Sequence, residues 1–458
     1  MKNLKNIISV YFVGAGGIGM SALVRYFLAK RKKVGGYDKT ATELTRQLIA
    51  EGADIHFEDN VALIPDYCRD VESTIVVRTP AVPEDHSELT YFRENGFWMV
   101  KRAEVLGEIT KTDRGICVAG THGKTTTSTM TAHLLKQSSV DCNAFLGGIL
   151  KNYDSNLMLS EKSDLTVIEA DEYDRSFHWL QPYMAVITSS DPDHLDIYGT
   201  EEAYLESFRI FTSLIQPGGC LVMKKGITVQ PDLQEGVKLY SYSIEEGDFH
   251  AENVRIGNGT ILFDFVTPTE KITEVELGVP VRINIENGIA AMALAWLNSV
   301  SADELRSGMK SYGGAKRRFD FYVKSDKFVL LDDYAHHPEE VKASISSVKQ
   351  LYPDRKLTVI FQPHLFSRTN DFYREFAESL SLADELILLD IYPARELPMK
   401  GVTSQLIFDL VTAQKKILCL KSELIDVFAK GSYDVVMTLG AGDIDIYIPQ
   451  IKEILEKQ

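Results

Sequence analysis

A short turn in the middle of the chain carries residues suited to binding a nucleoside triphosphate. Residues 120–125 (GTHGKT) follow an apolar run and precede an expected helix at 124–136. Backbone N–H groups in such a turn, together with the helix N-terminus, can enclose phosphate oxygens. Lys124 would add a positive charge at the β- and γ-phosphates, and Thr125 a hydroxyl ligand for Mg²⁺. Because Val118 stands where the full P-loop motif has its first glycine, an ordinary strand-to-helix turn containing a lysine is the alternative.

Two acidic segments after apolar runs are candidates for holding a divalent metal ion. The segment 165–174 (LTVIEADEYD) contains Glu169, and the segment 187–199 (ITSSDPDHLDIYG) contains His194. Carboxylates and an imidazole beside a phosphate loop suit a hard ion that bridges phosphates. We select Glu169 and His194 as candidate ligands, whereas most of the neighbouring aspartates fit a solvated loop.

A second glycine-rich turn lies near the N-terminus. In ISVYFVGAGGIGMSALVRYFLAK (8–30), Gly14, Gly16 and Gly19 have the G-x-G-x-x-G spacing of dinucleotide-binding folds. Asp38 follows nineteen residues after Gly19, where a carboxylate can bind a ribose. The pattern alone fits an NAD-dependent oxidoreductase as well as another ligand with a diphosphate, such as a UDP-sugar.

Basic and aromatic residues of the last third form another candidate group. The segment GGAKRRF places Lys316, Arg317 and Arg318 together at an expected domain boundary, where a guanidinium could reach a γ-phosphate. Surface charge on a linker is the alternative for each of them. Two further segments, DDYAHHPEE and FQPHLFSRT, end expected strands and supply Tyr334, His336, His337, His364 and Arg368.

The elements that must position these residues repeat three times along the chain. Each repeat consists of apolar strands that alternate with helices and end in polar residues, as ligand-binding α/β sheets do. We therefore predict a three-domain α/β protein: a Rossmann-like domain at 1–107, a central P-loop ATPase-like domain at 108–314 and a Rossmann-like domain at 315–458. A small antiparallel excursion is expected near HAENVRIGNGTILFDFVT, before a helix at 285–297.

Composition narrows the class of partner and the compartment. The net charge of −16 repels nucleic acid and anionic membranes, so an anionic substrate needs a local cluster of donors. The five cysteines are widely spaced without a C-x-x-C pair, which fits reduced thiols of a cytoplasmic protein rather than disulfides or zinc. We expect the apolar run 7–24 to be part of the first glycine turn and not an export signal.

Ten segments in order along the chain resemble the Mur ligase family. They are FVGAGGIGMSAL, RAEVLGEI, VAGTHGKTTT, EADEYDRSF, DPDHLDIYG, GAKRRFDF, DDYAHHPEE, FQPHLFSRT, DIYPARE and LGAGDI. The resemblance is to the branch that joins L-alanine to the lactyl carboxylate of UDP-N-acetylmuramate, and it implies that the first glycine turn binds UDP and the second ATP. The implied reaction uses ATP and Mg²⁺, passes through an acyl phosphate and yields ADP and phosphate in peptidoglycan synthesis. No nucleic acid or membrane partner is implied, and a monomer or weak homodimer is expected.

The resemblance also implies roles for individual residues. Lys124, Glu169, His194 and Arg318 would be catalytic, with Thr125 and Glu169 on a first Mg²⁺ and His194 on a second. The implied ATP contacts are Gly120, Thr121, His122, Gly123, Lys124, Thr125, Thr126, Asn284, Asn287, Arg318 and Asp333. The implied UDP-sugar contacts are Gly14, Gly16, Gly17, Ile18, Gly19 and Asp38. The implied amino-acid contacts are Tyr334, His336, His337 and Arg368.

Some positions depart from the family pattern. Ile283 replaces the usual histidine before Asn284, and Leu365 and Phe366 replace the usual Arg-Tyr pair, which leaves Arg368 as the better candidate for the alanine carboxylate. No lysine occurs between His194 and Lys224, so no carbamoylated lysine is expected. The competing interpretations are a muropeptide ligase of cell-wall recycling, an NAD-dependent oxidoreductase, which would have no use for GTHGKTT, and a non-catalytic nucleotide sensor.

Overall fold

Three parallel sheets, one after another along the chain, carry the candidate residues. The computed structural model describes residues 4–79, 81–192, 195–257, 259–394 and 396–458. The chain forms two compact units: unit 1 contains the residues up to Glu252 with Asp264–Val275 and Glu286–Tyr312, and unit 2 contains Asn253–Phe263, Glu276–Ile285 and Gly313–Gln458. The α/β class with three parallel-sheet regions is confirmed. The domain boundaries near residues 107 and 314 remain predictions.

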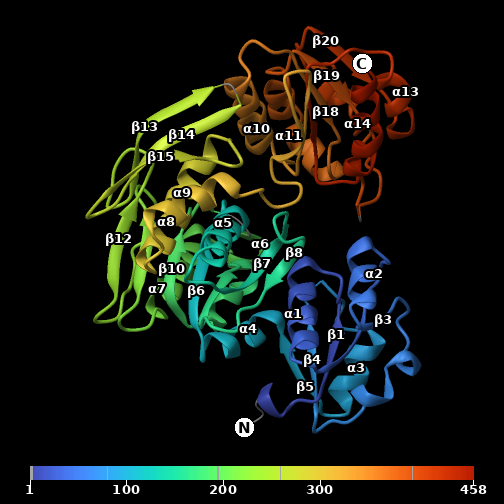
Figure 1. The fold of residues 1–458 in the computed structure, drawn as a ribbon. Helices are drawn as coiled ribbons and strands as arrows, with labels where there is room; N and C mark the ends of the chain where they lie inside the picture. The colour runs from blue at the N-terminus through green and yellow to red at the C-terminus, as the bar shows by residue number, and fades with distance from the viewer. Residues whose placement is uncertain (1–3, 80, 193–194, 258, 395) are drawn as a thin grey trace. The chain divides into compact units, whose positions relative to one another are not determined.

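The first sheet of unit 1 has the strand order β3-β2-β1-β4-β5, and all of its pairs are parallel (Figure 1). Its strands are β1 (Ser9–Val13), β2 (Lys33–Tyr37), β3 (Asp54–His56), β4 (Thr74–Arg78) and β5 (Trp98–Lys101). Its helices are α1 (Ile18–Ala29), α2 (Glu43–Ala50), α3 (Ser87–Glu94) and α4 (Arg102–Thr110). Phe12 of β1 packs in one apolar cluster with Leu23 of α1, and Tyr11 packs in another with Phe92 of α3. Helices on both faces explain why β1 is buried along its whole length.

The second sheet of unit 1 has the order β12-β11-β10-β6-β9-β7-β8, and only the β7–β8 pair is antiparallel. Its strands are β6 (Arg114–Ala119), β7 (Asn143–Leu150), β8 (Ser155–Met158), β9 (Leu165–Glu169), β10 (Pro182–Ile187), β11 (Cys220–Lys224) and β12 (Lys238–Tyr242). Its helical segments are α5 (Lys124–Gln137), η4 (Tyr173–Trp179), α6 (Leu195–Tyr198) and α7 (Glu201–Ser213). Because β6 and β9 are adjacent and parallel, residues that follow them meet at one edge of the sheet.

The third sheet, in unit 2, has the order β16-β17-β21-β18-β19-β20, with an antiparallel β16–β17 pair and parallel pairs elsewhere. Its strands are β16 (Asp320–Lys324), β17 (Val329–Asp333), β18 (Leu357–Phe361), β19 (Glu385–Leu388), β20 (Lys415–Leu418) and β21 (Val435–Leu439). Its helices are α10 (Pro338–Leu351), α11 (Phe366–Leu380), α12 (Gln405–Phe408), α13 (Leu424–Phe428) and α14 (Ile448–Lys457).

The excursion predicted before the helix at 285–297 is a separate three-stranded sheet. β13 (His250–Gly257), β14 (Thr260–Val266) and β15 (Lys271–Glu276) pair in that order, and α8 (Ile283–Leu297) and α9 (Ala302–Ser311) come next. Helix α1 ends at Ala29, and Arg31 just beyond it takes a left-handed φ of 57° that closes the helix end.

The cysteines are free thiols. Cys68, Cys117, Cys142 and Cys220 are buried and Cys419 is half-buried. Burial raises the pKa of Cys68 and Cys220 to about 12 and that of Cys419 to about 11, so these thiols stay protonated near neutral pH. No helix in the described part of the chain is long and apolar enough to cross a bilayer.

Candidate active site

The predicted phosphate turn lies between β6 and α5. Gly120 and Gly123 have φ values of 133° and 83°, which only glycine adopts without strain. A Cβ atom on Gly120 would lie 2.2 Å from the Thr188 hydroxyl oxygen, so the turn also needs glycine there for lack of space. Helix α5 begins at Lys124 without a side-chain cap, which leaves its first N–H groups directed at the turn.

Lys124 is held inside this turn by a buried carboxylate. Its Nζ atom lies 2.8 Å from Oε1 of Glu172 and donates to the carbonyl oxygens of Gly120 and Thr121 at 2.7 and 3.3 Å. Glu172 is only 1% exposed, and burial raises its pKa while Lys124 acts against that rise. The buried ion pair shows that Glu172 does not belong to a solvated loop.

Glu169 ends β9 beside the first turn of α5. Its Oε1 accepts a hydrogen bond from the Thr125 hydroxyl at 3.1 Å, and its Oε2 accepts from the backbone N–H of Gly147 at 3.2 Å. Burial raises the pKa of Glu169, whereas Lys124, Thr125 and Arg102 act to lower it. A Cβ atom on Gly147 would lie 2.3 Å from the Glu169 carboxylate, so a glycine there leaves room for this side chain.

The oxygen atoms of Thr125 and Glu169 suit Mg²⁺. Magnesium in phosphate-binding sites uses one or two carboxylates together with phosphate oxygens and waters. Among the described residues no group of three or more His, Cys, Asp or Glu side chains is arranged for a metal ion. His194, the predicted ligand of a second Mg²⁺, lies outside the described residues.

The other residues of the turn have distinct surroundings. The Thr121 hydroxyl donates to the carbonyl oxygen of Asp191 at 2.7 Å, and the His122 side chain is exposed. The backbone N–H of His122 donates to the Ser189 hydroxyl at 2.7 Å. Thr126 lies in the first turn of α5 and is half-buried. These contacts fix the turn on the neighbouring strand β10.

The first glycine turn is equally well defined. Gly14 has a φ of 91°, and its N–H donates to the carbonyl oxygen of Tyr37 at 2.8 Å. The Asp38 carboxylate accepts from the N–H of Gly16 at 2.7 Å and from that of Thr40 at 3.1 Å. Gly17 precedes α1 without a side-chain cap, and Ile18 and Gly19 form the first turn of the helix. The structure therefore brings the six predicted UDP-sugar residues together.

The two asparagines at the start of α8 are both buried. Asn287, in unit 1, accepts from the Thr127 hydroxyl at 3.3 Å, and its Oδ1 would lie 2.7 Å from a Cβ atom on Gly123. Asn287 therefore lies against the phosphate turn. Asn284, in unit 2, donates to the carbonyl oxygen of Val279 at 3.1 Å. Ile283, which replaces a histidine, is 54% exposed.

The two adjacent arginines of unit 2 have different contacts. Arg317 contacts the Asp332 carboxylate at 3.2 Å and donates to the carbonyl oxygens of Gly442 and Gly440 at 2.8 and 2.6 Å. Arg318 is exposed, and its guanidinium lies 5.3 Å from the ring centre of Tyr334. Arg317 therefore stabilises the fold of unit 2, whereas Arg318 is accessible to a ligand.

Asp333 ends β17 next to these arginines. Its carboxylate accepts from the N–H of Phe319 at 3.2 Å and from the Ser344 hydroxyl. Burial raises its pKa, and the bond from Ser344 and the charge of Arg318 act in the opposite direction.

Four of the aromatic and basic residues of unit 2 form one cluster. The ring centres of Tyr334 and His336 are 5.2 Å apart, those of His336 and His364 are 6.0 Å apart, and Nη1 of Arg368 lies 3.4 Å from Nδ1 of His364. His337 turns elsewhere: it caps α10 and packs on Phe372 with ring centres 5.0 Å apart. Leu365 has a left-handed φ of 71°, so the replaced position is also a strained one.

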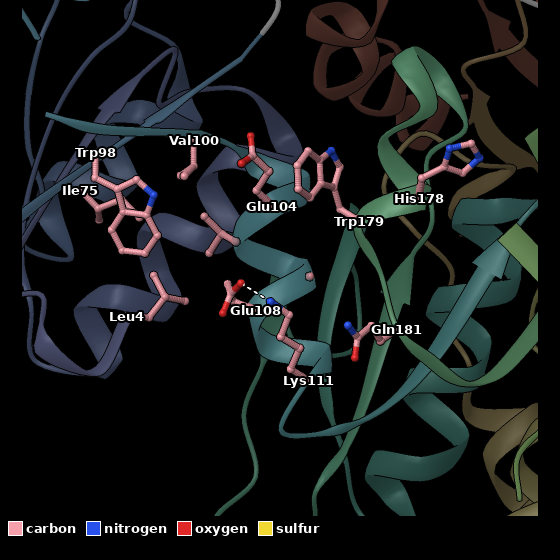
Figure 2. Close-up of a pocket in the computed structure, with 12 residues that line it drawn as sticks. Leu4, Ile75, Trp98, Val100, Glu104, Glu108, Lys111, His178, Trp179 and Gln181 are labelled. Atoms are coloured by element: carbon pink, nitrogen blue, oxygen red, sulfur yellow. Dashed lines mark hydrogen bonds and ion pairs between the residues drawn. The ribbon is translucent and has the colours of Figure 1, made fainter. Parts of the chain in front are cut away.

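A pocket of about 360 Å³ in unit 1 contains none of the predicted residues. Figure 2 shows Trp98 of β5 and Trp179 of η4 on two sides of it, with Glu104 and Glu108 of α4 between them. A Cβ atom added to Gly107 would lie 2.4 Å from the carbonyl oxygen of Trp179. The absence of a side chain on Gly107 thus lets η4 pack closely on α4.

Two charged residues escaped the sequence prediction. Glu172 lies in a segment of several carboxylates that the sequence alone does not tell apart, although it comes three residues after Glu169. Arg102, at the start of α4, lies 3.6 Å from Asp171 in the segment after β9. This contact joins segments about seventy residues apart, which the sequence pattern does not predict. The one signal in the sequence is that Arg102 belongs to the RAEVLGEI segment.

Comparison with known proteins assigns the chain to a family. Residues 9–114 match the Mur ligase family catalytic domain, residues 118–295 the Mur ligase middle domain and residues 317–442 the Mur ligase glutamate ligase domain. A protein of Parabacteroides distasonis named UDP-N-acetylmuramate–L-alanine ligase is 67% identical over 457 residues, covering 100% of this chain and 99% of its own length. The chain belongs to the Mur ligase family.

Further Mur ligases agree with this assignment. The protein of the same name from Porphyromonas gingivalis is 57% identical over 98% of this chain and 99% of its own. The crystal structure of UDP-N-acetylmuramate-alanine ligase MurC from Thermotoga maritima superposes with a TM-score of 0.82 at 26% identity, covering 98% of each chain. A murein peptide ligase from Psychrobacter arcticus shares the fold with a TM-score of 0.66 at 19% identity, covering 98% of this chain and 99% of its own.

Proposed function

We propose that this Mur ligase joins L-alanine to UDP-N-acetylmuramate at the expense of ATP, and forms UDP-N-acetylmuramoyl-L-alanine, ADP and phosphate. The observation that carries the proposal is the turn at 120–125, where Lys124 folds back on the turn and Thr125 contacts Glu169 at the end of β9. The 67% identity to a full-length L-alanine ligase supports the choice of amino acid.

The chemistry needs an activated carboxylate, because a carboxylate and an amine do not form an amide unaided at neutral pH. A lactyl carboxylate oxygen attacks the γ-phosphorus, the bond to the bridging oxygen of ADP breaks, and an acyl phosphate results. The amine of L-alanine then attacks the carbonyl carbon, and phosphate leaves from the tetrahedral intermediate with the former carboxylate oxygen.

Residues of this chain stabilise the charge that develops on the transferred phosphoryl group. Lys124 leaves Glu172 to contact the β- and γ-phosphates, and Arg318 contributes a guanidinium. Thr125 and Glu169, with His194 for a second ion, would hold Mg²⁺, which supplies further neutralisation of phosphate charge when bound. Asn287 and Asn284 fit the adenine side, and Asp333 the ribose.

The remaining substrates use the other two groups of residues. The turn of Gly14, Gly16, Gly17, Ile18 and Gly19, with Asp38, takes the UDP part of the sugar nucleotide. Tyr334, His336 and Arg368 take L-alanine, with Arg368 on its carboxylate, while His337 acts through the fold of α10. We expect the protein to work in the cytoplasm as a monomer or weak homodimer, since its substrates are small molecules.

Phosphate release from ATP and Mg²⁺ with UDP-N-acetylmuramate tests the proposal. L-Alanine should stimulate release strongly, and L-alanyl-γ-D-glutamyl-diaminopimelate should not. Stimulation by the tripeptide alone would assign the chain to the muropeptide ligases, and no stimulation by either acceptor would contradict a ligase of this type. NAD binding at the first turn would then be the next measurement.

A further inference from the structure

We propose that Arg102 binds the diphosphate of the UDP-sugar, an inference that rests on the proposed function. Arg102 is the first residue of α4, which follows β5 in the same sheet as the first glycine turn. A Cβ atom on Gly19 would lie 2.5 Å from its Nη1 atom and 3.0 Å from Cζ. The guanidinium therefore lies against the first turn of α1, and a glycine at position 19 leaves space for it.

The donors of Arg102 are mostly unused. Its side chain is 25% exposed, and in the described part of the chain its only charged partner within 4 Å is Asp171, at 3.6 Å. A guanidinium has five N–H donors, and buried donors in folded proteins normally have acceptors. The unused donors point to an anionic ligand of planar, bidentate geometry such as a phosphate.

The charges around the first turn of α1 also favour an anionic ligand. The first turn of α1 contains no acidic residue, and a positive charge beside a helix N-terminus is unfavourable unless an anion lies near. The Asp38 carboxylate, just after β2, contacts the glycine turn but already accepts from the N–H of Gly16. The remaining N–H groups at the start of α1 and the guanidinium of Arg102 can hold a diphosphate together.

Arg102 also contacts the segment that carries Glu172. Asp171, its partner, precedes Glu172, which holds Lys124, and Lys101 pairs with Asp174 in the same segment. The close packing of η4 on α4 at Gly107 fixes this segment on α4. A diphosphate held by Arg102 would therefore lie beside the segment that holds Lys124 through Glu172.

The test compares the affinities of UDP and uridine by calorimetry for the wild type, Arg102→Met and Arg102→Lys. In Arg102→Met the preference for UDP over uridine should fall about 10- to 100-fold with uridine affinity unchanged, as expected for a lost hydrogen bond to a charged group. Arg102→Lys should recover part of the preference. Arg114→Met, which removes an exposed partner of Asp164, serves as the matched control and should bind both ligands normally.

Other outcomes separate this inference from the proposed function. An unchanged UDP preference in Arg102→Met, or an equal loss of UDP and uridine affinity, would overturn the role of Arg102 while leaving the ligase reaction intact. A wild type that prefers UDP, loses the preference in Arg102→Met and yet shows no phosphate release with L-alanine would support Arg102 and contradict the proposed function. A wild type without UDP preference would overturn the role of Arg102, and phosphate release with L-alanine would still decide the proposed function.

Discussion

The Nζ atom of Lys124 and the Oε1 atom of Glu172 form an ion pair at 2.8 Å, and the Glu172 side chain is almost completely buried. The lysine of the phosphate turn is thus held by a carboxylate of the same unit. In the proposed function the phosphates of ATP replace Glu172 as the partner of Lys124, which would link nucleotide binding to the stability of the turn.

The first prediction concerns this pair. Glu172→Gln removes a buried charge from Lys124 and should destabilise the protein by about 2 kcal/mol, which lowers Tm by roughly 4–8 °C. Saturating ATP should reduce the difference from the wild type, since the phosphates then contact Lys124. Thermal unfolding with and without ATP measures both effects. Glu108→Gln, which removes an exposed partner of Lys111, is the control, and an equal shift in the control would argue against the pair.

Lys124 itself should be required for turnover. Lys124→Ala removes the charge that we propose for the β- and γ-phosphates and should lower kcat by about 100-fold or more. Lys111→Ala, on an exposed helix face, should leave kcat unchanged. A Lys124→Ala variant with near-normal phosphate release would show that the turn is not the ATP site.

Two glycines with nearly the same φ allow the effect of backbone strain to be distinguished from that of steric crowding. Gly123 and Gly226 have φ values of 83° and 84°, but an added Cβ at Gly226 meets nothing within 4 Å, whereas at Gly123 it lies 2.7 Å from Oδ1 of Asn287. Both alanine variants should lose about 1 kcal/mol of stability, and only Gly123→Ala should raise KM for ATP, by about 10-fold or more. Equal KM values in the two variants would contradict this account of the turn.

Much of the site is predictable from the sequence because it is local. The glycine turns, Lys124 and Glu169 each follow an apolar strand directly, and parallel strands bring such ends to one sheet edge. Contacts between distant segments are not predictable in this way: the burial of Glu172 and the pair of Arg102 with Asp171 depend on how α4 packs on the segment after β9. His336 and His337 are neighbours in sequence, yet only His336 joins the cluster, because α10 begins at Pro338 and its cap directs His337 toward Phe372.

Arg317 and Arg318 should have opposite phenotypes. Arg317→Met loses its bonds to Asp332, Gly440 and Gly442 and should lower Tm by several degrees with little change in kcat of the folded enzyme. Arg318→Met should keep Tm, because its side chain is exposed, and should lower kcat by about 100-fold if it supplies the proposed charge at the γ-phosphate. The reverse pattern would move the phosphate contact to Arg317.

A buried carboxyl in the first sheet makes stability depend on pH. Glu88 accepts from the Tyr11 hydroxyl at 2.7 Å, and burial raises its pKa from 4.5 to about 7. The unfolded chain therefore releases this proton first, and the contribution of Glu88 to stability falls as the pH rises from about 4.5 to 7. Burial lowers the pKa of the neighbouring His56, which acts in the opposite direction by reducing stability at low pH.

Comparison with Glu88→Gln isolates the carboxyl, since glutamine stays neutral and can still accept from Tyr11. The Tm of the variant should rise relative to that of the wild type as the pH increases from about 5 to 7.5. The reason is that only the wild type has a buried carboxyl whose pKa is raised to about 7. Glu43→Gln, at an exposed position, should follow the wild type throughout. Parallel profiles for Glu88→Gln and the wild type would mean that Glu88 is ionised in the native protein across this range.

The most direct test of the central claim follows the oxygen atoms of the substrate carboxylate. UDP-N-acetylmuramate labelled with oxygen-18 in its lactyl carboxylate is incubated with ATP, Mg²⁺ and L-alanine, and the released phosphate is analysed by mass spectrometry. Activation through an acyl phosphate predicts that one labelled oxygen moves into each phosphate formed. Unlabelled phosphate, formed while ATP is consumed, would mean that water rather than the carboxylate attacks ATP, and would contradict the ligase mechanism.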